Sequence, residues 1–287
     1  MAVSLKGEDF GRLVDYFGGH RDLAEGVVRV LHNLSFIDDP TRIFRAIRYE
    51  TRYGFHMDGH TLSLARACVE MELVGELSSS RLRDELQALL SEERVAASVR
   101  RMAALGIDRA IHPHLAADEE TVRLLDELDE LRARYAPEAP AWRVRLVALV
   151  RRLGPTEVLD WAERLKLRRR DAERIADAVA VAPRVRELAG STKEPAALWA
   201  RVAPHDPDGA LLALAGAKGR ARKRLIRYFE ELRAVRLEIS GGDLAELGLR
   251  ESPRVGAVLD ELLRRKLNGE LDGRSAEIEA ARELLKA

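Results

Sequence analysis

Apolar positions recur at helical spacing along most of the chain. From Asp39 onward, segments of about 10 to 18 residues carry apolar side chains at i, i+3, i+4 and i+7, and Gly or Pro residues separate them. No alternating strand pattern interrupts these segments. The pattern predicts a mainly α-helical protein with helices that begin near Asp39, His60, Ser80, Glu92, Asp118, Pro140, Pro155, Arg169, Glu194, Asp206, Lys218, Gly242, Ser252 and Arg274.

The first 32 residues follow a different pattern. Short runs rich in β-prone residues occupy positions 2–5, 12–16 and 27–31, and Gly-containing turns separate them. Three short strands with so few apolar residues cannot form a stable core alone. We therefore expect this segment to be the edge of a mixed α/β unit.

The first long helix is predicted to have two distinct faces. Asp39 is a favourable N-cap and Pro40 suits the first helical position, where no backbone N–H is needed. At 100° per residue, four arginines fall within an arc of about 120°, and apolar residues occupy most of the remaining surface. These arginines are Arg42, Arg45, Arg48 and Arg52.

This arrangement has two interpretations. A guanidinium beside a fixed carboxylate offers a donor fork and an acceptor that can read the edge of a nucleic-acid base, and further arginines can hold phosphates. Alternatively, the helix is an ordinary amphipathic one whose arginines pair with nearby acids. Spacing alone does not decide between them.

Composition limits the possible partners without identifying one. The 287 residues include 48 basic and 48 acidic side chains, so any RNA binding must come from local patches. Cys68 is the single cysteine, which excludes an intrachain disulfide and a cysteine zinc cage. No run of about 18 apolar residues occurs, so we expect a soluble cytoplasmic protein.

Two C-terminal segments are candidate RNA contacts. The segment 218–227 is the densest basic run, and a solvated helix face is the alternative interpretation. The segment 252–259 begins with a capping serine and a proline, and its glycine permits close approach to free helix amides, a natural phosphate site. The predicted RNA-binding residues are Arg220, Lys223, Arg224, Arg227, Ser252, Arg254 and Gly256.

Two further groupings could suggest metal chemistry. His112 and His114 flank a loop proline without close acidic partners in the sequence, so a surface loop is expected. Asp206 and Asp208 form the nearest Asp-x-Asp pair, but no strand or Gly-Ser turn precedes them, which favours a cap or loop. We predict no metal site in this chain.

Residues 28–49 closely resemble the nucleotide-selecting segment of class II tRNA nucleotidyltransferases and bacterial poly(A) polymerases. In that family an E/D-D-x-x-R motif supplies an acid and an arginine as a protein template for the incoming base. Carried over, the resemblance makes Asp39 and Arg42 the template, with Arg45 and Arg48 as further nucleotide-binding residues. Asp38 stands where most members have Glu, a small departure.

Other motifs of the family resemble segments near both ends of the chain. Residues 15–23 are similar to a D-x-F-G-G-x-x-D-L segment late in the catalytic head, and residues 80–86 to an E-R-I-R-x-E-L helix that braces the nucleotide-selecting one, with Ser80 replacing Glu. Residues 241–256 resemble the tail motif G-x-D-L-x-x-L-G followed by G-P-x-I-G, with Ser252 in the place of a glycine. The resemblance assigns structural support to Asp38, Arg81 and Glu85.

The resemblance also implies an incomplete head. Met1 and Ala2 match the end of an R-R-D-F-T-I-N-A-M-A motif, so we expect the chain to begin inside it, with the paired metal-binding aspartates upstream in relatives. We therefore assign no catalytic residue here and expect Mg²⁺ only with that missing catalytic head. The expected parts are a head edge (1–32), a nucleotide-selecting neck (33–114), a helical body (115–236) and a tRNA-binding tail (237–287).

The implied function is RNA binding and nucleotide selection within an enzyme that adds CMP and/or AMP, from CTP or ATP, to RNA 3′ ends. The expected partners are tRNA or another RNA 3′ end, with a separate catalytic head as a further possibility. We expect the chain alone to be inactive. The alternative is a non-catalytic tRNA-binding helical protein or a split-enzyme subunit, and oligomeric state is left open.

Overall fold

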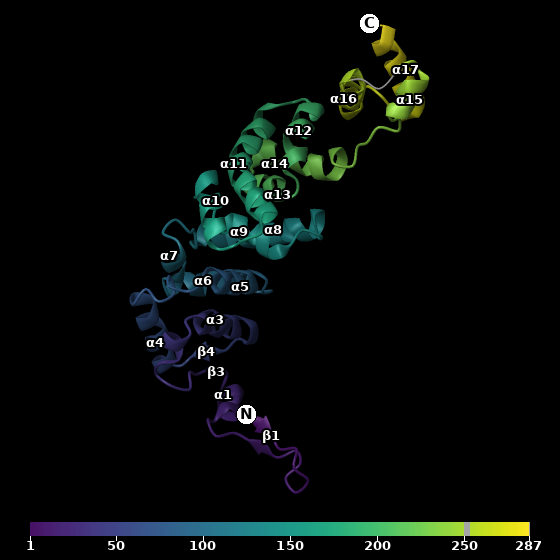
Figure 1. Cartoon of the computed structure of the whole chain (residues 1–287). Helices are drawn as coiled ribbons and strands as arrows, with labels where there is room; N and C mark the ends of the chain where they lie inside the picture. The colour runs from purple at the N-terminus through teal and green to yellow at the C-terminus, as the bar shows by residue number, and fades with distance from the viewer. Residues whose placement is uncertain (250–252, 287) are drawn as a thin grey trace. The chain divides into compact units, whose positions relative to one another are not determined.

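The structure is a computed structural model that describes residues 1–249 and 253–286. The chain divides into two compact units, Met1–Val179 and Ala180–Ala287 (Figure 1). This division does not bear on the four parts expected from the sequence, which stay predictions.

The strands of the first unit are short. β1 (Ala2–Val3) pairs antiparallel with β2 (Leu13–Val14), and β3 (Val27–Val28) pairs parallel with β4 (His56–Met57). The three predicted β-prone runs are confirmed, whereas β4 was not predicted. A strand of two residues is too short to show the alternation that identifies strands in a sequence.

Helices make up most of the first unit. They are α1 (Gly19–Glu25), α2 (Ser35–Asp38), α3 (Thr41–Tyr53), α4 (Gly59–Glu70), α5 (Ser79–Leu90), α6 (Val95–Ala104), α7 (Ile107–Ile111), α8 (Glu119–Tyr135), α9 (Ala141–Leu149) and α10 (Pro155–Arg164), followed by α11 (Arg169–Ser191), which continues into the second unit. The sequence missed α1, α2 and α7, which are 7, 4 and 5 residues long and therefore too short to show a helical period. Helix α5 begins at Ser79, one residue before the start predicted at Ser80, so Ser80 lies inside the helix and is not its cap.

Helix α3 lies at the centre of the packing that positions the candidate site. Its apolar face buries Ile43, Phe44 and Ile47 completely, and each contributes about 2 kcal/mol by leaving water. This face packs against α5 and α6, which in turn contact α9 and α8 (Figure 1). Gly54 ends α3 with a φ of 71°, a left-handed conformation that favours glycine.

The second unit is also helical. After α11 come α12 (Pro195–Val202), a 3-10 turn (Ala203–His205), α13 (Asp208–Ala215), α14 (Gly219–Arg227), a π-helical turn (Tyr228–Leu232), α15 (Gly241–Glu246), α16 (Pro253–Leu267) and α17 (Gly273–Lys286). The mainly α-helical expectation is confirmed for the residues that the structure describes.

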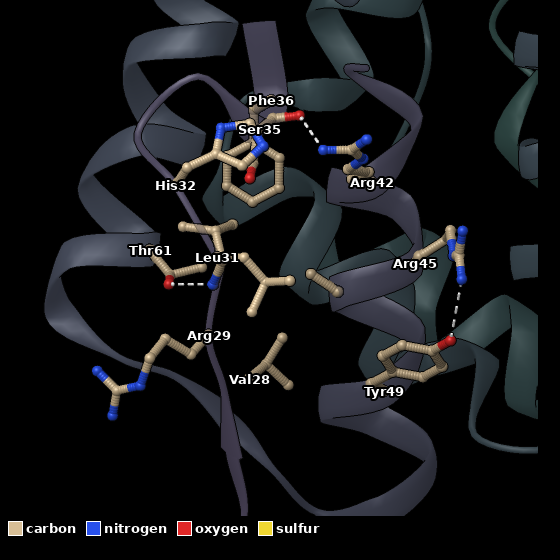
Figure 2. A pocket seen from close by; sticks show the side chains of 12 residues that line it. Val28, Arg29, Leu31, His32, Ser35, Phe36, Arg42, Arg45, Tyr49 and Thr61 are labelled. Carbon is tan, nitrogen blue, oxygen red and sulfur yellow. Dashed lines mark hydrogen bonds between the residues drawn. The ribbon is translucent and has the colours of Figure 1, made fainter. Parts of the chain in front are cut away.

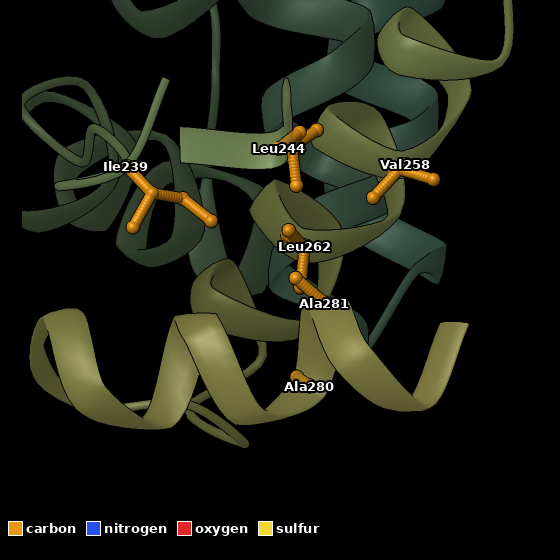
Figure 3. Close-up of a cluster of buried hydrophobic side chains, with 6 residues drawn as sticks. All are labelled: Ile239, Leu244, Val258, Leu262, Ala280 and Ala281. Carbon is orange, nitrogen blue, oxygen red and sulfur yellow. The ribbon is translucent and has the colours of Figure 1, made fainter. Parts of the chain in front are cut away.

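A small core joins the last three helices. Leu244 of α15, Val258 and Leu262 of α16, and Ala281 of α17 point toward one another (Figure 3). In α16, the helical spacing of apolar residues predicted from the sequence is confirmed at Val258 and Leu262, which are buried.

A buried carboxylate fixes the segment that leads into this core. Glu277 is fully buried and binds the ammonium group of Lys266 at 2.6 Å. It also accepts hydrogen bonds from the amides of Glu238 and Ile239 at 2.8 and 3.1 Å. These partners compensate the cost of burying the charge.

In the part of the chain that the structure describes, no helix is both long enough and apolar enough to cross a membrane.

Candidate nucleotide-selecting site

Asp39 is fixed at the start of α3. Its Oδ1 accepts hydrogen bonds from the amide and the hydroxyl of Thr41, at 3.1 and 2.6 Å. The helix begins at Thr41 with Pro40 as its N-cap residue, so the expected assignment of Asp39 to the N-cap and Pro40 to the first helical position is wrong. The Asp39 carboxylate nevertheless accepts a hydrogen bond from the first helical amide. A carboxylate is favourable at this end because the helix dipole is positive there.

A second element holds the same carboxylate. Arg81 of α5 donates from Nη2 to Asp39 Oδ1 at 2.6 Å. Burial opposes ionisation of Asp39, but the Thr41 hydrogen bonds and the charges of Arg81 and Arg42 outweigh it and hold the pKa of this carboxyl below its ordinary value. Asp39 is therefore ionised at neutral pH and held from two helices.

Arg42 lies beside this fixed acid. Its Nη1 donates to the carbonyl of Ser35 at 3.1 Å, and its Nε lies 3.9 Å from Asp39 Oδ2. The Asp39 and Arg42 side chains are 23% and 42% exposed. Within residues 1–249 and 253–286, Asp39 Oδ2 and Arg42 Nη2 make no other hydrogen bond, so an acceptor and a donor stand side by side for a ligand.

A cavity of about 360 Å³ opens next to Arg42. Figure 2 shows Arg42, Arg45 and Tyr49 along α3 on one side, and Val28 of β3 with Arg29 and Leu31 of the following segment on the other. The complete lining is Val28, Arg29, Val30, Leu31, His32, Ser35, Phe36, Arg42, Arg45, Ala46, Tyr49 and Thr61. Apolar walls with a few cationic groups suit a planar base that carries an anionic tail.

The arginines of α3 separate into two groups. Arg42 and Arg45 line the cavity, and Arg45 lies 3.4 Å from the hydroxyl of Tyr49. Arg48 and Arg52 instead bind Glu92, whose carboxylate is 6% exposed, at 2.8 and 2.5 Å. Arg48, like Asp39, is outside the cavity lining. The ion-pair interpretation therefore holds for Arg48 and Arg52, whereas nucleotide binding by Arg42 and Arg45 stays a prediction.

The expected supporting acids differ in their surroundings. Glu85 of α5 lies 3.7 Å from the Arg48 guanidinium, and burial raises the pKa of its carboxyl. Arg81, one helical turn before Glu85, binds Asp39. Asp38 is exposed, with its nearest cationic candidate, His32, at 3.9 Å.

The basic residues of α14 also fall into two groups, those bound by protein groups and those exposed without an ion pair. Arg224 donates to the carbonyls of Ala189 and Gly190, at the end of α11, at 2.9 and 3.0 Å, and Arg227 pairs with Glu231 at 2.7 Å. Arg220 and Lys223 are exposed, and neither has an ion pair among the described residues. These two are the α14 cations available to a phosphate backbone.

The predicted phosphate site of α16 is partly described. Arg254 is exposed and its Nη2 lies 3.4 Å from the carbonyl of Leu284. A side chain at Gly256 would meet open space, so none of the described residues blocks approach to this turn. Ser252 lies outside the described residues.

Sequence reasoning missed Thr41 and Tyr49. Thr41 supplies two of the hydrogen bonds that fix Asp39, and Tyr49 forms part of the cavity wall beside Arg45. The position of Tyr49 one helical turn after Arg45 was a usable signal, because residues four apart share a helix face.

Known proteins match both the sequence and this geometry. A family model described as "Probable RNA and SrmB- binding site of polymerase A" matches residues 54–119. The A-adding tRNA nucleotidyltransferase of Geobacter sulfurreducens is 34% identical over 98% of this chain. The Thermotoga maritima CCA-adding enzyme complexed with tRNA_CCA matches 99% of the chain with a TM-score of 0.85 and 28% identity. Over nearly its whole length the chain resembles class II tRNA nucleotidyltransferases in both sequence and fold.

The match covers only part of these relatives. The chain spans 33% of the length of the Geobacter nucleotidyltransferase and 70% of the Thermotoga enzyme chain. Structures of a CCA-adding enzyme with CTP and with ATP both give TM-scores of 0.85 at 28% identity, over 99% of this chain and 69% and 67% of theirs. The family resemblance and the helical fold class expected from the sequence are therefore confirmed.

The Mg²⁺ expected for nucleotidyl transfer does not fit the described residues. In 1–249 and 253–286, one group of three potential metal-ligating side chains comes together, and it contains two histidines and a single carboxylate. A two-metal phosphoryl-transfer site instead needs carboxylates that bridge a pair of hard cations. We derive no step through Mg²⁺ from this chain.

Proposed function

We propose that this chain supplies the nucleotide-selecting and RNA-binding part of a tRNA nucleotidyltransferase that adds CMP and/or AMP to RNA 3′ ends. One observation carries the proposal: Asp39, fixed by Thr41 and Arg81, keeps one oxygen open beside the guanidinium of Arg42. A rigid acceptor next to a rigid donor forms a template for a base edge.

The template favours particular bases. Cytosine and adenine each present an exocyclic amine donor beside a ring nitrogen acceptor, whereas uracil and guanine present a carbonyl acceptor beside a ring N–H. The Asp39 carboxylate accepts from the amine, and Arg42 donates to the ring nitrogen. Uracil or guanine would place acceptor against acceptor and leave polar groups unpaired, which costs binding energy.

The rest of the nucleotide has suitable contacts nearby. Arg45 lines the cavity next to Arg42 and offers a second guanidinium for phosphate oxygens. Structural relatives in complex with CTP and with ATP support nucleotides as the ligand class. Glu92 holds the guanidinium of Arg48, so we propose that Arg48 contributes to the nucleotide site by fixing α3.

RNA binding has separate support. The matching family model is described as an RNA-binding site, and a structural relative is complexed with tRNA. Arg220 and Lys223 of α14 and Arg254 of α16 are exposed cations that suit a phosphate backbone. A cytoplasmic location stays a prediction.

We further propose that the 287-residue polypeptide does not form the phosphodiester bond by itself, because the one group of three potential metal-ligating side chains among its described residues holds two histidines and a single carboxylate. Purified chain would be incubated with tRNA, Mg²⁺ and labelled CTP or ATP. We expect incorporation at background, and incorporation above background would overturn this point.

A tRNA-binding measurement on the same chain tests the RNA-binding part of the proposal. We expect tRNA affinity to fall with salt, and to fall further when Arg220 and Lys223 are changed to Glu. The matched control is Glu230→Gln, an exposed position in the turn that follows α14. No tRNA affinity at low salt, or equal affinity in the Arg220 and Lys223 variant, would contradict the proposal.

One observation favours the split-enzyme alternative. Large apolar side chains are exposed along the first 37 residues, among them Leu5, Phe10 and Tyr16, which are 80%, 75% and 89% exposed. Exposed apolar side chains of this size suit a protein interface. A separately produced nucleotidyltransferase head that restored incorporation in trans would support a split enzyme, and tRNA binding without restoration would support a non-catalytic tRNA-binding protein.

A further inference from the structure

Two histidines and one carboxylate converge in the first unit, away from the cavity. His112 and His114 lie in the loop between α7 and α8, and Glu157 lies in the first turn of α10. Glu157 Oε1 is 2.6 Å from His114 Nδ1 and 3.6 Å from His112 Nε2. The three potential ligand atoms all lie within 4.8 Å of one another, so the histidines have the acidic partner that their sequence neighbourhood lacks.

The backbone and the packing fix each of these side chains. His112 is in an extended conformation, with φ −161° and ψ 131°, and alternate residues of an extended segment face the same side. The His112 ring is 7% exposed and lies edge-on against Trp161, with ring centroids 6.0 Å apart. Glu157 Oε2 accepts the amide of Gly154 at 3.3 Å, which leaves Oε1 directed toward the histidines.

We propose that His112, His114 and Glu157 form a binding site for a divalent transition-metal ion, with Zn²⁺ as the preferred type. Two imidazole nitrogens and one carboxylate oxygen are a common Zn²⁺ donor set, with the fourth position left to water. Ligands at about 2.0 to 2.1 Å on a tetrahedral ion lie about 3.3 to 3.5 Å apart, which small side-chain adjustments achieve here.

The protonation states of His112 and Glu157 favour metal binding at neutral pH, but a hydrogen bond of His112 limits the affinity. Burial lowers the pKa of His112, and the His114 hydrogen bond lowers the pKa of Glu157, so a neutral imidazole and a carboxylate are present. However, His112 Nδ1 accepts the amide of His114 at 3.2 Å, and metal binding at Nε2 requires a proton on Nδ1. That hydrogen bond must open, so the site binds less tightly than a closed four-ligand zinc site.

The bound ion would connect the loop before α8 to the start of α10. Both elements belong to the first unit, and neither contributes to the cavity lining. The expected effect is therefore stabilisation of this unit, because a ligand that binds the folded state raises its apparent stability. This inference does not depend on the proposed nucleotidyltransferase function.

The test is titration of the metal-free chain with Zn²⁺ by calorimetry, and with Co²⁺ followed by visible absorption. Two variants remove ligands at accessible positions, His114→Ala and Glu157→Gln, whose native side chains are 62% and 35% exposed. Matched controls are Glu163→Gln, exposed on α10, and His20→Ala, exposed on α1. Circular dichroism confirms that each variant is folded.

We expect the wild-type chain to bind a single ion at this site with a ligand-field spectrum of low coordination number. Each ligand variant should lose at least about tenfold in affinity, while both controls bind as the wild type does. Absence of saturable binding below about 100 µM, or equal affinity in the His114 and Glu157 variants, would overturn the proposal.

Discussion

Helices α3 and α14 each carry a row of basic residues. In both rows, protein groups bind some of the cations and leave others exposed or beside a cavity. In α3, Arg42 and Arg45 line a cavity while Arg48 and Arg52 bind Glu92. In α14, Lys223 is exposed while Arg224 binds the carbonyls at the end of α11. The acids and carbonyls brought close by tertiary packing, and not the basic pattern itself, decide which cations remain available to a ligand.

The largest expected effect concerns the acid that occupies the second half of α3. Changing Glu92 to Gln removes the charge that two guanidinium groups surround, and we expect the free energy of unfolding to fall by about 2 kcal/mol. This is below the cost of breaking a fully buried pair because Arg48 and Arg52 are partly exposed. Urea denaturation measures the change, and the exposed neighbour variant Glu93→Gln should be neutral. Equal stability of the Glu92 variant and the wild type would mean that Arg48 and Arg52 are not held as described.

The ion pairs of Glu92 with Arg48 and Arg52 also predict that stability depends on pH. Burial opposes ionisation of Glu92, but hydrogen bonds from Arg52 and Arg48 prevail and lower the pKa of its carboxyl below 4.5. Because the pKa is lower in the folded state, the stabilisation is fully present above pH 4.5 and disappears as the pH falls through the lowered value. The stability difference between the wild type and Glu92→Gln should therefore be constant from pH 7 to 5 and shrink below pH 4.5. A difference that stays constant down to pH 3 would show that the carboxylate charge is not responsible.

A smaller effect separates the cations of α14. Arg224→Ala removes charged hydrogen bonds to the end of α11, and we expect a loss of about 1 kcal/mol in stability. Lys223→Ala, one residue earlier and exposed, should change stability by less than about 0.5 kcal/mol but should reduce the salt dependence of tRNA binding. A stability loss in Lys223→Ala, together with a changed salt dependence in Arg224→Ala, would show that the two side chains have the opposite roles.

The sequence was most informative where structure repeats or follows local rules. The helical period located α3, α5, α8 and the later long helices, and Asp39 followed by Pro40 indicated the start of α3, although the N-cap residue is Pro40 and not Asp39. Helices of one or two turns carry too few apolar positions to show a period, so α1, α2 and α7 were missed.

Contacts between distant segments could not be predicted from spacing. Arg48 and Glu92 are 44 residues apart, and Glu157 lies 43 residues after His114. Helical spacing identifies partners three or four residues away, whereas these pairs depend on how helices pack. For the same reason Arg81 could be assigned a bracing role by family resemblance, while its partner Asp39 became visible only in the structure.

We propose that Asp39 and Arg42 select the base. Competitive incorporation of all four nucleotides on tRNA tests this directly, in an active form that includes a nucleotidyltransferase head, with Arg42→Ala compared against the wild type. We expect the preference for C and A over U and G to fall at least about tenfold while tRNA affinity is unchanged. Unchanged selectivity in the Arg42 variant would contradict it.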